Sequence, residues 1–129
     1  MEQEIQKKWY IKVWLEGKCL DLWSLNHTFF GASMAGLFIL ISVPFWISLL
    51  ISFIAMVAWE FWEHFRRIHE SLCNKIFDVL TGLLGFFIVH NLVEAYAHEV
   101  GIFVFIIIFY IALELWGCWA FRKIGRHFI

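Results

Sequence analysis

Long apolar runs alternate with short polar stretches along this chain, and the alternation predicts four helices. The apolar runs cover about residues 25–43, 45–64, 76–94 and 100–120. Each is close to the ~20 residues that a helix needs to cross the hydrocarbon core of a bilayer. The connections are short, so consecutive helices are expected to be antiparallel neighbours. We therefore predict an all-α fold, an integral membrane four-helix bundle that forms a single domain over residues 1–129.

The N-terminal residues follow a different pattern. Ile5, Trp9 and Val13 recur at four-residue spacing, with lysines between them. This periodicity is typical of an amphipathic helix that lies in the membrane interface, with its aromatic rings at headgroup depth and its lysines toward anionic lipid. We predict such a helix over about residues 4–16, and Gly17 can end it.

Composition supports a membrane protein and argues against several other classes. Hydrophobic residues make up 62% of the chain and aromatic residues 20%, whereas soluble domains are about half apolar. The mean hydropathy is +0.76. The sequence holds neither a glycine-rich phosphate loop nor a serine beside a base, so nucleotide binding and nucleophilic catalysis have little support. The basic residues form short clusters at helix ends, and nucleic acid is not an expected partner.

All ten Lys and Arg residues fall on one side of the predicted bundle. They are Lys7, Lys8, Lys12, Lys18, Arg66, Arg67, Lys75, Arg122, Lys123 and Arg126. The positive-inside rule then places both termini, and the hinge between the second and third spans, in the cytoplasm. Cys19, Cys73 and Cys118 lie on the same side without CxxC spacing. We therefore expect free thiols rather than disulfides.

Ionisable residues at the cytoplasmic ends of the spans form the candidate site. On translocon scales an acidic residue costs ~2.5–3.5 kcal/mol at the centre of a span, so Glu60 is expected to face protein. On the third span, Asn74 and Asp78 share a helix face with Gly82 and Gly85. The candidate ligand-binding residues are His27, Glu60, Glu63, His64, Arg66, Arg67, Asn74, Asp78 and Glu114. The alternative for Glu63 and His64 is a solvated helix end.

A second polar ladder lies at the outer end of the third span. His90, Glu94 and His98 follow one another at four-residue spacing. Two imidazoles and a carboxylate at this spacing can hold a metal ion. The alternative is again a solvated helix end.

Around the candidate site the sequence resembles the VanZ-like family of small bacterial membrane proteins. The matching positions lie within residues 24–88: His27 with Gly31, Glu60 with Glu63, Ser71, Asn74 with Asp78, and Gly82 with Gly85. The sequence departs from the family pattern in the order of Asn and Asp, in having Glu63 where glutamine is usual, and in lacking a lysine before His27. The resemblance implies a small inner-membrane protein linked to glycopeptide resistance and cell-envelope processes. It does not imply a particular reaction.

Three functions are compatible with the predicted cluster. In the first, the protein binds a lipid or lipid-linked headgroup of the cell envelope, with carboxylates orienting hydroxyl or amine groups and the basic rim holding phosphate. In the second, the same side chains hold a metal ion that activates water for hydrolysis. In the third, an oligomer conducts protons or ions. We favour the first, with membrane lipids as ligands and without a cofactor, while a divalent metal belongs to the second. Self-association or a larger membrane partner is compatible with each.

Overall fold

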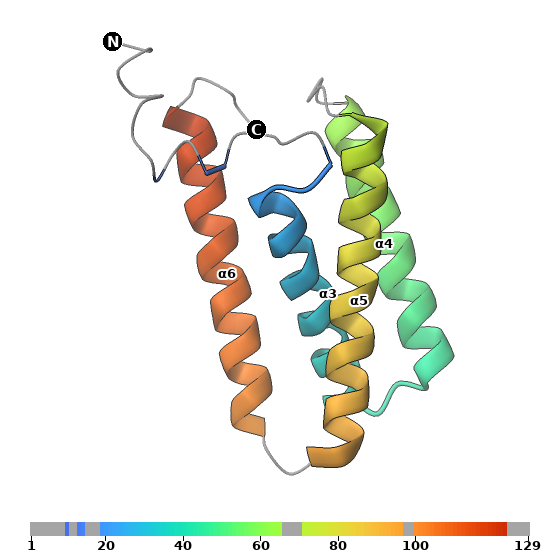
Figure 1. The fold of residues 1–129 in the computed structure, drawn as a ribbon. Helices are drawn as coiled ribbons and strands as arrows, with labels where there is room; N and C mark the ends of the chain where they lie inside the picture. Colours follow the sequence, from blue (N-terminus) through green and yellow to red (C-terminus); the bar gives the residue numbers. More distant parts are fainter. Residues whose placement is uncertain (1–9, 11–12, 15–18, 66–70, 97–99, 124–129) are drawn as a thin grey trace.

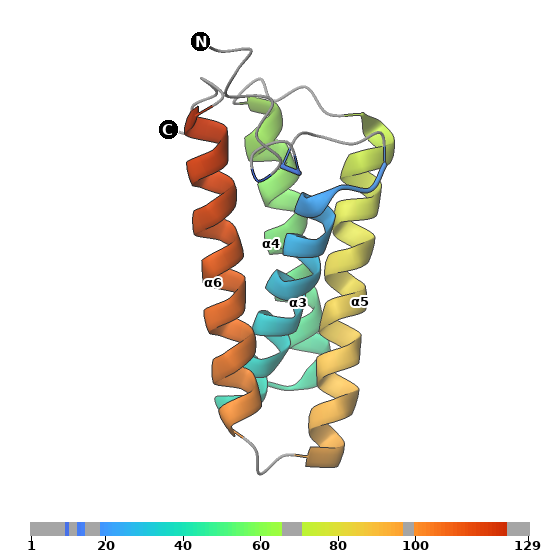
Figure 2. The ribbon, with the colours of Figure 1, turned by 60° about the vertical axis from the view of Figure 1, so that its left-hand side comes forward.

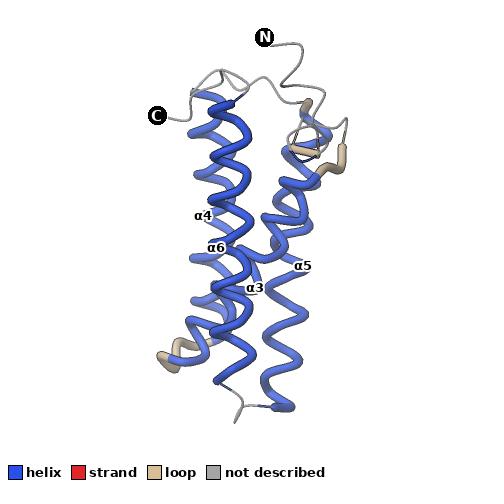
Figure 3. The backbone as a smooth tube through the Cα atoms, turned by 90° about the vertical axis from the view of Figure 1, so that its left-hand side faces the viewer, coloured by secondary structure: helices blue, strands red, loops and turns tan. Residues whose placement is uncertain are grey.

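The computed structural model describes residues 10, 13–14, 19–65, 71–96 and 100–123, and this part of the chain is helical without strands (Figure 3). The helices are α3 (Leu22–Leu40), α4 (Phe45–Phe65), α5 (Leu72–Tyr96) and α6 (Val100–Lys123). α3 and α5 run in one direction, and α4 and α6 run in the other (Figure 1). We call the end where α3 and α5 begin, and where α4 and α6 finish, the polar end.

Three of the described helices are long and apolar enough to cross a membrane: α4, residues Leu72–Leu92 of α5, and α6. α3 is not among them, because its first turns carry Ser24, Asn26 and His27. It lies between the other helices and packs against each of them (Figure 2). The predicted all-helical membrane architecture is therefore confirmed for its helices and for three membrane-length segments, whereas α3 as a fourth span stays a prediction.

Short polar side chains set where α3 and α5 begin. Asp21 accepts hydrogen bonds from the backbone N–H groups of Trp23 at 2.9 Å and Ser24 at 3.1 Å, and Ser24 bonds back to the Asp21 backbone. This reciprocal capping box satisfies donors that a helix start leaves open. The hydroxyl of Ser71 likewise accepts from the backbone N–H of Asn74 at 3.1 Å. Both helices therefore begin about one turn before the predicted spans.

Glycines bring α3 and α5 into close backbone contact. A Cβ atom added to Gly31 would overlap the carbonyl oxygen of Gly82, and one added to Gly85 would overlap the carbonyl oxygen of Thr28. Small residues permit this approach between helices in membranes, where packing rather than hydrophobic burial holds helices together. Gly31, Gly82 and Gly85, which belong to the sequence motif, are thus packing positions within the bundle.

Aromatic side chains pack closely near the polar end. Trp14, which lies within the predicted interfacial helix, is fully buried. Its ring contacts Trp23 at a centroid distance of 4.7 Å and Trp116 at 5.4 Å. Both Trp14 and Trp23 pack over Gly117 of α6, where the missing side chain leaves room for two indoles. The rest of the predicted interfacial helix, apart from Tyr10 and Val13, lies outside the described residues.

The expectation of free thiols is wrong for two of the three cysteines. Cys19 and Cys73 form a disulfide between the segment before α3 and the first turn of α5, with their Cα atoms 4.9 Å apart. Cys118 is free. The sequence argument considered spacing along the chain and the redox compartment. It did not foresee that two parallel helices would begin side by side, which brings these residues together across 54 positions.

The glycine contact makes a prediction for stability. Gly31→Ala should lower the free energy of unfolding in detergent by about 1–3 kcal/mol, because the added methyl group must displace the Gly82 backbone rather than a flexible side chain. Gly101→Ala is the matched control: a Cβ there meets nothing within 4 Å, so better helix propensity should leave stability equal or slightly higher. Chemical or thermal unfolding followed by circular dichroism measures both variants. Equal stabilities would contradict the close α3–α5 contact.

Candidate functional site

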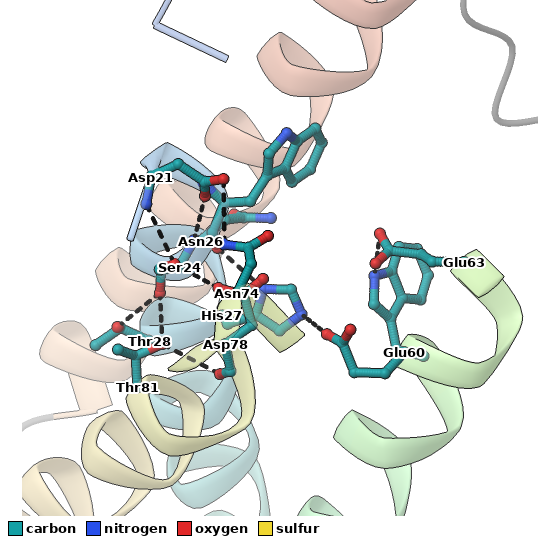
Figure 4. Close-up of polar contacts among 12 residues, drawn as sticks. Asp21, Ser24, Asn26, His27, Thr28, Glu60, Glu63, Asn74, Asp78 and Thr81 are labelled. Carbon is teal, nitrogen blue, oxygen red and sulfur yellow. Dashed lines mark hydrogen bonds and ion pairs between the residues drawn. The ribbon is translucent and has the colours of Figure 1, made fainter. Parts of the chain in front are cut away.

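Polar side chains from α3, α4 and α5 meet inside the polar end of the bundle (Figure 4). We call these residues the polar cluster, and each is buried: Ser24, His27, Glu60, Asn74 and Asp78. α3 and α5 contribute at matching heights because they run in parallel from this end and touch at their glycines. The cluster therefore unites side chains from three helices, with up to 54 positions between them in the sequence.

His27 connects α3 to α4. Its Nε2 atom lies 3.4 Å from Oε1 of Glu60, and its Nδ1 atom lies 2.9 Å from the carbonyl oxygen of Trp23. A carbonyl oxygen only accepts hydrogen bonds, so Nδ1 must carry the proton in this contact. The imidazole is thereby held with Nε2 toward Glu60. Because the exposed fraction is 7% for each of the two residues, water screens their interaction weakly.

Asp78 connects α5 to α3. It accepts a hydrogen bond from the hydroxyl of Ser24, and its exposed fraction is only 1%. Next to this contact, Thr81 donates its hydroxyl to the Ser24 carbonyl at 2.9 Å and to the Asp78 carbonyl at 3.1 Å. Thr28 also donates to the Ser24 carbonyl, at 3.0 Å. Hydroxyl groups thus line the place where the two helices meet.

Asn74 ties the chain before α3 to the start of α5. Its Nδ2 group donates to the Asp21 carboxylate at 3.3 Å and to the Cys19 carbonyl at 3.4 Å. The Oδ1 atom is also buried, and it accepts no hydrogen bond from the part of the chain that the structure describes. Asn74 therefore offers a carbonyl oxygen at the edge of the cluster, one helical turn before Asp78.

The candidate residues on α4 separate in the structure. Glu60 joins the cluster, whereas Glu63 is buried and accepts a hydrogen bond from the indole N–H of Trp59 at 2.8 Å. His64 is exposed. Consecutive residues of a helix point about 100° apart, so Glu63 and His64 diverge on either side of Glu60. Arg66 and Arg67, predicted as the rim, lie outside the described residues.

Glu114 of α6 lies near the polar cluster and contacts a residue of α3. It accepts a hydrogen bond from Nδ2 of Asn26, and the Cys118 thiol lies 3.6 Å from its other carboxylate oxygen. With Asn26 and His27 it lines a cavity of about 110 Å³. The structure therefore places Glu114 on the α6 side of His27, while Glu60 and Asp78 meet His27 from α4 and α5.

The second candidate metal set has a different outcome. The imidazole of His90 packs against the rings of Phe45 and Phe86, at centroid distances of 4.6 Å and 6.0 Å. The side chain of Glu94 and all of His98 lie outside the described part of the chain. A metal at this outer end thus stays a prediction.

Among the described residues, His27, Glu60 and Asp78 are grouped closely enough to share an ion, with ligand atoms all within 4.8 Å of one another.

Sequence reasoning did not single out Asp21, Ser24 or Thr81 as parts of the site. One local signal could have found the first two. An acidic residue followed three positions later by a hydroxyl residue, before an apolar run, resembles a capping box. That signal would have started the helix at Leu22 and placed Ser24 one turn before Thr28. The contact between Ser24 and Asp78 depends on packing between helices, and no local pattern predicts it.

A groove between α4 and α5 opens beside the cluster. It has a volume of about 530 Å³, and its walls are mainly apolar. Its polar members are Glu60, His64 and Lys75, close to the polar end. A second groove of about 440 Å³ shares Phe53 and Leu83 with the first and extends toward the other end of the bundle. Glu60 therefore belongs to the polar cluster and also lines the groove.

Comparison of the chain with protein-family models, with curated proteins and with solved structures found no match. The resemblance to the VanZ-like family accordingly rests on the sequence motif, and the functional argument rests on the geometry of the cluster and the groove.

The Ser24–Asp78 hydrogen bond makes a prediction for stability. Ser24→Ala should lower the free energy of unfolding by about 1.5–3 kcal/mol, because the buried carboxylate of Asp78 would lose the hydrogen bond that Ser24 donates. Ser52→Ala is the matched control, since that hydroxyl is also buried but, within the described part of the chain, bonds only the Ser48 carbonyl of its own helix, at 2.8 Å. Detergent-phase unfolding curves compare the two. A larger loss for Ser52→Ala would contradict the role given to Ser24.

Proposed function

We propose that the protein binds a membrane phospholipid in the groove between α4 and α5. The acyl chain lies along the apolar walls, and the headgroup lies at the polar end beside Glu60, His64 and Lys75. One observation carries this proposal: two adjoining grooves on α4 and α5 are lined mainly by apolar side chains, and the first ends at Glu60, His64 and Lys75 beside the polar cluster. An amphiphile has this same distribution of apolar and polar groups.

The walls of the groove suit an acyl chain. Phe53, Val57 and Phe61 face it from α4, and Ile76, Leu80 and Leu83 face it from α5. Both helices are long and apolar enough to cross a membrane, so the groove opens toward lipid. Its volume of about 530 Å³ falls within the range of roughly 300–1,000 Å³ that is usual for small-molecule sites.

The polar end of the groove selects the headgroup. Lys75 lies in the first turns of α5, and its ammonium group suits a phosphate. An ionised Glu60 only accepts hydrogen bonds, so its partner in a headgroup must be a hydroxyl or an amine. Phosphatidylethanolamine and phosphatidylglycerol carry such donors beside the phosphate, whereas phosphatidylcholine does not. We therefore propose a preference for the first two lipids. A role in handling envelope lipids would fit the VanZ-like resemblance.

A groove-filling substitution tests the acyl-chain site. Val79 of α5 lines the groove. Val79→Phe should reduce the amount of phospholipid that co-purifies with the protein several-fold, because the larger ring occupies the space of the chain. Val104→Phe is the control, since Val104 is 46% exposed on α6 and lies away from the groove. Native mass spectrometry after detergent exchange counts bound lipids per chain. Equal retention by the two variants would show that the groove holds no specific lipid.

The headgroup arm of the same experiment uses defined lipids. Wild-type protein is incubated with phosphatidylethanolamine, phosphatidylglycerol or phosphatidylcholine of identical acyl chains. We expect the first two to be retained over phosphatidylcholine, and Lys75→Gln to weaken all three because the phosphate contact is lost. Lys123→Gln, at an exposed position near the end of α6, should not change retention. Equal binding of all three lipids by wild-type protein would contradict the role given to Glu60.

We also propose an orientation in the bacterial inner membrane, with both termini and the polar end in the cytoplasm. The support is the one-sided distribution of Lys and Arg. The cytoplasm keeps thiols reduced, so under this proposal the Cys19–Cys73 disulfide forms when the protein is exposed to air.

Trapping thiols in living cells checks the orientation. Rapid acid quenching and alkylation, followed by mass spectrometry, should find Cys19 and Cys73 alkylated in cells and linked in protein that was purified without reductant. The free Cys118 reports the efficiency of alkylation in both samples. A linked pair in freshly quenched cells would instead place the polar end in an oxidising compartment.

A further inference from the structure

Three buried side chains from three helices converge at one point of the polar cluster, and we propose that they bind a divalent transition-metal ion. His27 comes from α3, Glu60 from α4 and Asp78 from α5, and one ligand atom of each lies within 4.8 Å of the other two (Figure 4). None of the three is more than 7% exposed. This site does not require a bound lipid, because its ligands belong to the protein alone.

The orientation of His27 favours an ion over a simple helix contact. Nδ1 donates to the Trp23 carbonyl at 2.9 Å, so in the neutral imidazole the lone pair lies on Nε2. That atom faces a carboxylate oxygen of Glu60 at 3.4 Å. A lone pair and a carboxylate repel each other unless a proton or a metal ion lies between them. Metal-bound histidines almost always donate their other N–H to a carbonyl or a carboxylate in this way.

The distances fit a shared ion after small movements of side chains. Zinc–nitrogen and zinc–oxygen bonds are about 2.0–2.2 Å long, so two ligands of a tetrahedral ion lie about 3.4 Å apart. The separation of Nε2 of His27 from Oε1 of Glu60 has this value. The largest separation in the group, 4.8 Å at most, closes when the Asp78 or Glu60 side chain moves by about an ångström toward the ion.

The surroundings provide support for the ligands and a further oxygen. The hydroxyl of Ser24 donates to Oδ1 of Asp78, which orients that carboxylate and leaves its second oxygen for the ion. Asn74 lies one turn before Asp78, and its buried Oδ1 atom accepts no hydrogen bond among the described residues. This oxygen can complete the coordination directly or through water. Glu60 has two oxygens, so it can ligate the ion with one and still accept from the groove with the other.

Charge and ligand type define the class of ion. A divalent ion balances the two carboxylates, whereas a protonated His27 would balance one of them. One imidazole nitrogen with carboxylate and amide oxygens suits Zn²⁺, Mn²⁺ or Fe²⁺, while Mg²⁺ and Ca²⁺ prefer oxygen ligands throughout. We take Zn²⁺ as the probe because it accepts four ligands of mixed nitrogen and oxygen type.

The test is a titration of purified protein with ZnCl₂. The full chain carries Cys118→Ser and is purified without reductant, so that Cys19 and Cys73 stay linked and no thiolate competes for zinc. Any polyhistidine tag is removed, and the sample is stripped with a chelator before calorimetry. We expect one Zn²⁺ per chain. Glu60→Gln and Asp78→Asn should each weaken binding at least 10-fold, because they replace a charged ligand by an amide of the same shape.

Two control variants keep the size and chemistry of the substitution constant. Glu63→Gln and Glu114→Gln change carboxylates at the same end of the bundle that lie outside the group of His27, Glu60 and Asp78, and each should bind zinc within twofold of the parent. Circular dichroism and gel filtration show that every variant is folded. A parent protein that binds no stoichiometric zinc would overturn the site. So would binding that survives in both Glu60→Gln and Asp78→Asn.

The outcome is separable from the lipid proposal. Val79→Phe and Lys75→Gln lie in the groove outside the ion's ligands, so both should bind zinc as the parent does even when they lose lipid. Absorption of Co²⁺-loaded protein gives a second readout, since the visible bands of cobalt report coordination by nitrogen and oxygen rather than by sulfur. A cobalt spectrum with thiolate bands would place the metal on cysteine and overturn the assignment to His27, Glu60 and Asp78.

Discussion

The close approach of α3 to α5 is the constraint on which the rest of the structure depends. Gly31 and Gly85 leave no room for a side chain between the two backbones, and a Cβ on Gly82 would meet the side chain of Met56 on α4. This contact sets the spacing of the parallel helices, and it brings the Ser24 hydroxyl within reach of Asp78. A larger residue at Gly31 or Gly85 would separate the helices and break the Ser24–Asp78 hydrogen bond, although no polar group would have been altered.

The polar cluster explains why α3 occupies the centre of the bundle. Its first turns carry Ser24, Asn26 and His27, which hydrocarbon would disfavour because buried polar groups need partners. The three helices that are apolar enough to face lipid surround it. Each polar side chain then finds its partner on a neighbour: Ser24 on α5, His27 on α4, and Asn26 on α6. Polar groups within α3 thus specify how the other helices are arranged around it.

Glu60 links the two activities proposed for the protein. It meets His27 on the inner side of α4 and borders the groove toward α5. A carboxylate in this position interacts with charged groups on both sides. An ion in the cluster would therefore alter the affinity of the groove for a headgroup, and a bound headgroup would alter the affinity of the cluster for the ion by the same factor. α4 packs against α5 less closely than α3 does, and this looser packing leaves the groove beside Glu60.

The sequence by itself determined the helices, their approximate bounds and the face on which Asn74, Asp78, Gly82 and Gly85 lie, because hydrophobic periodicity and helix geometry act between residues a few positions apart. It also indicated that Glu60 must face protein, from the cost of an acid in hydrocarbon. Only the tertiary structure decided the partners. The Cys19–Cys73 disulfide, the burial of Trp14, the divergence of Glu63 from His64 and the contact of Ser24 with Asp78 all depend on which helices are neighbours and at what height they meet. Those relations join residues that are distant along the chain, and no local pattern encodes them.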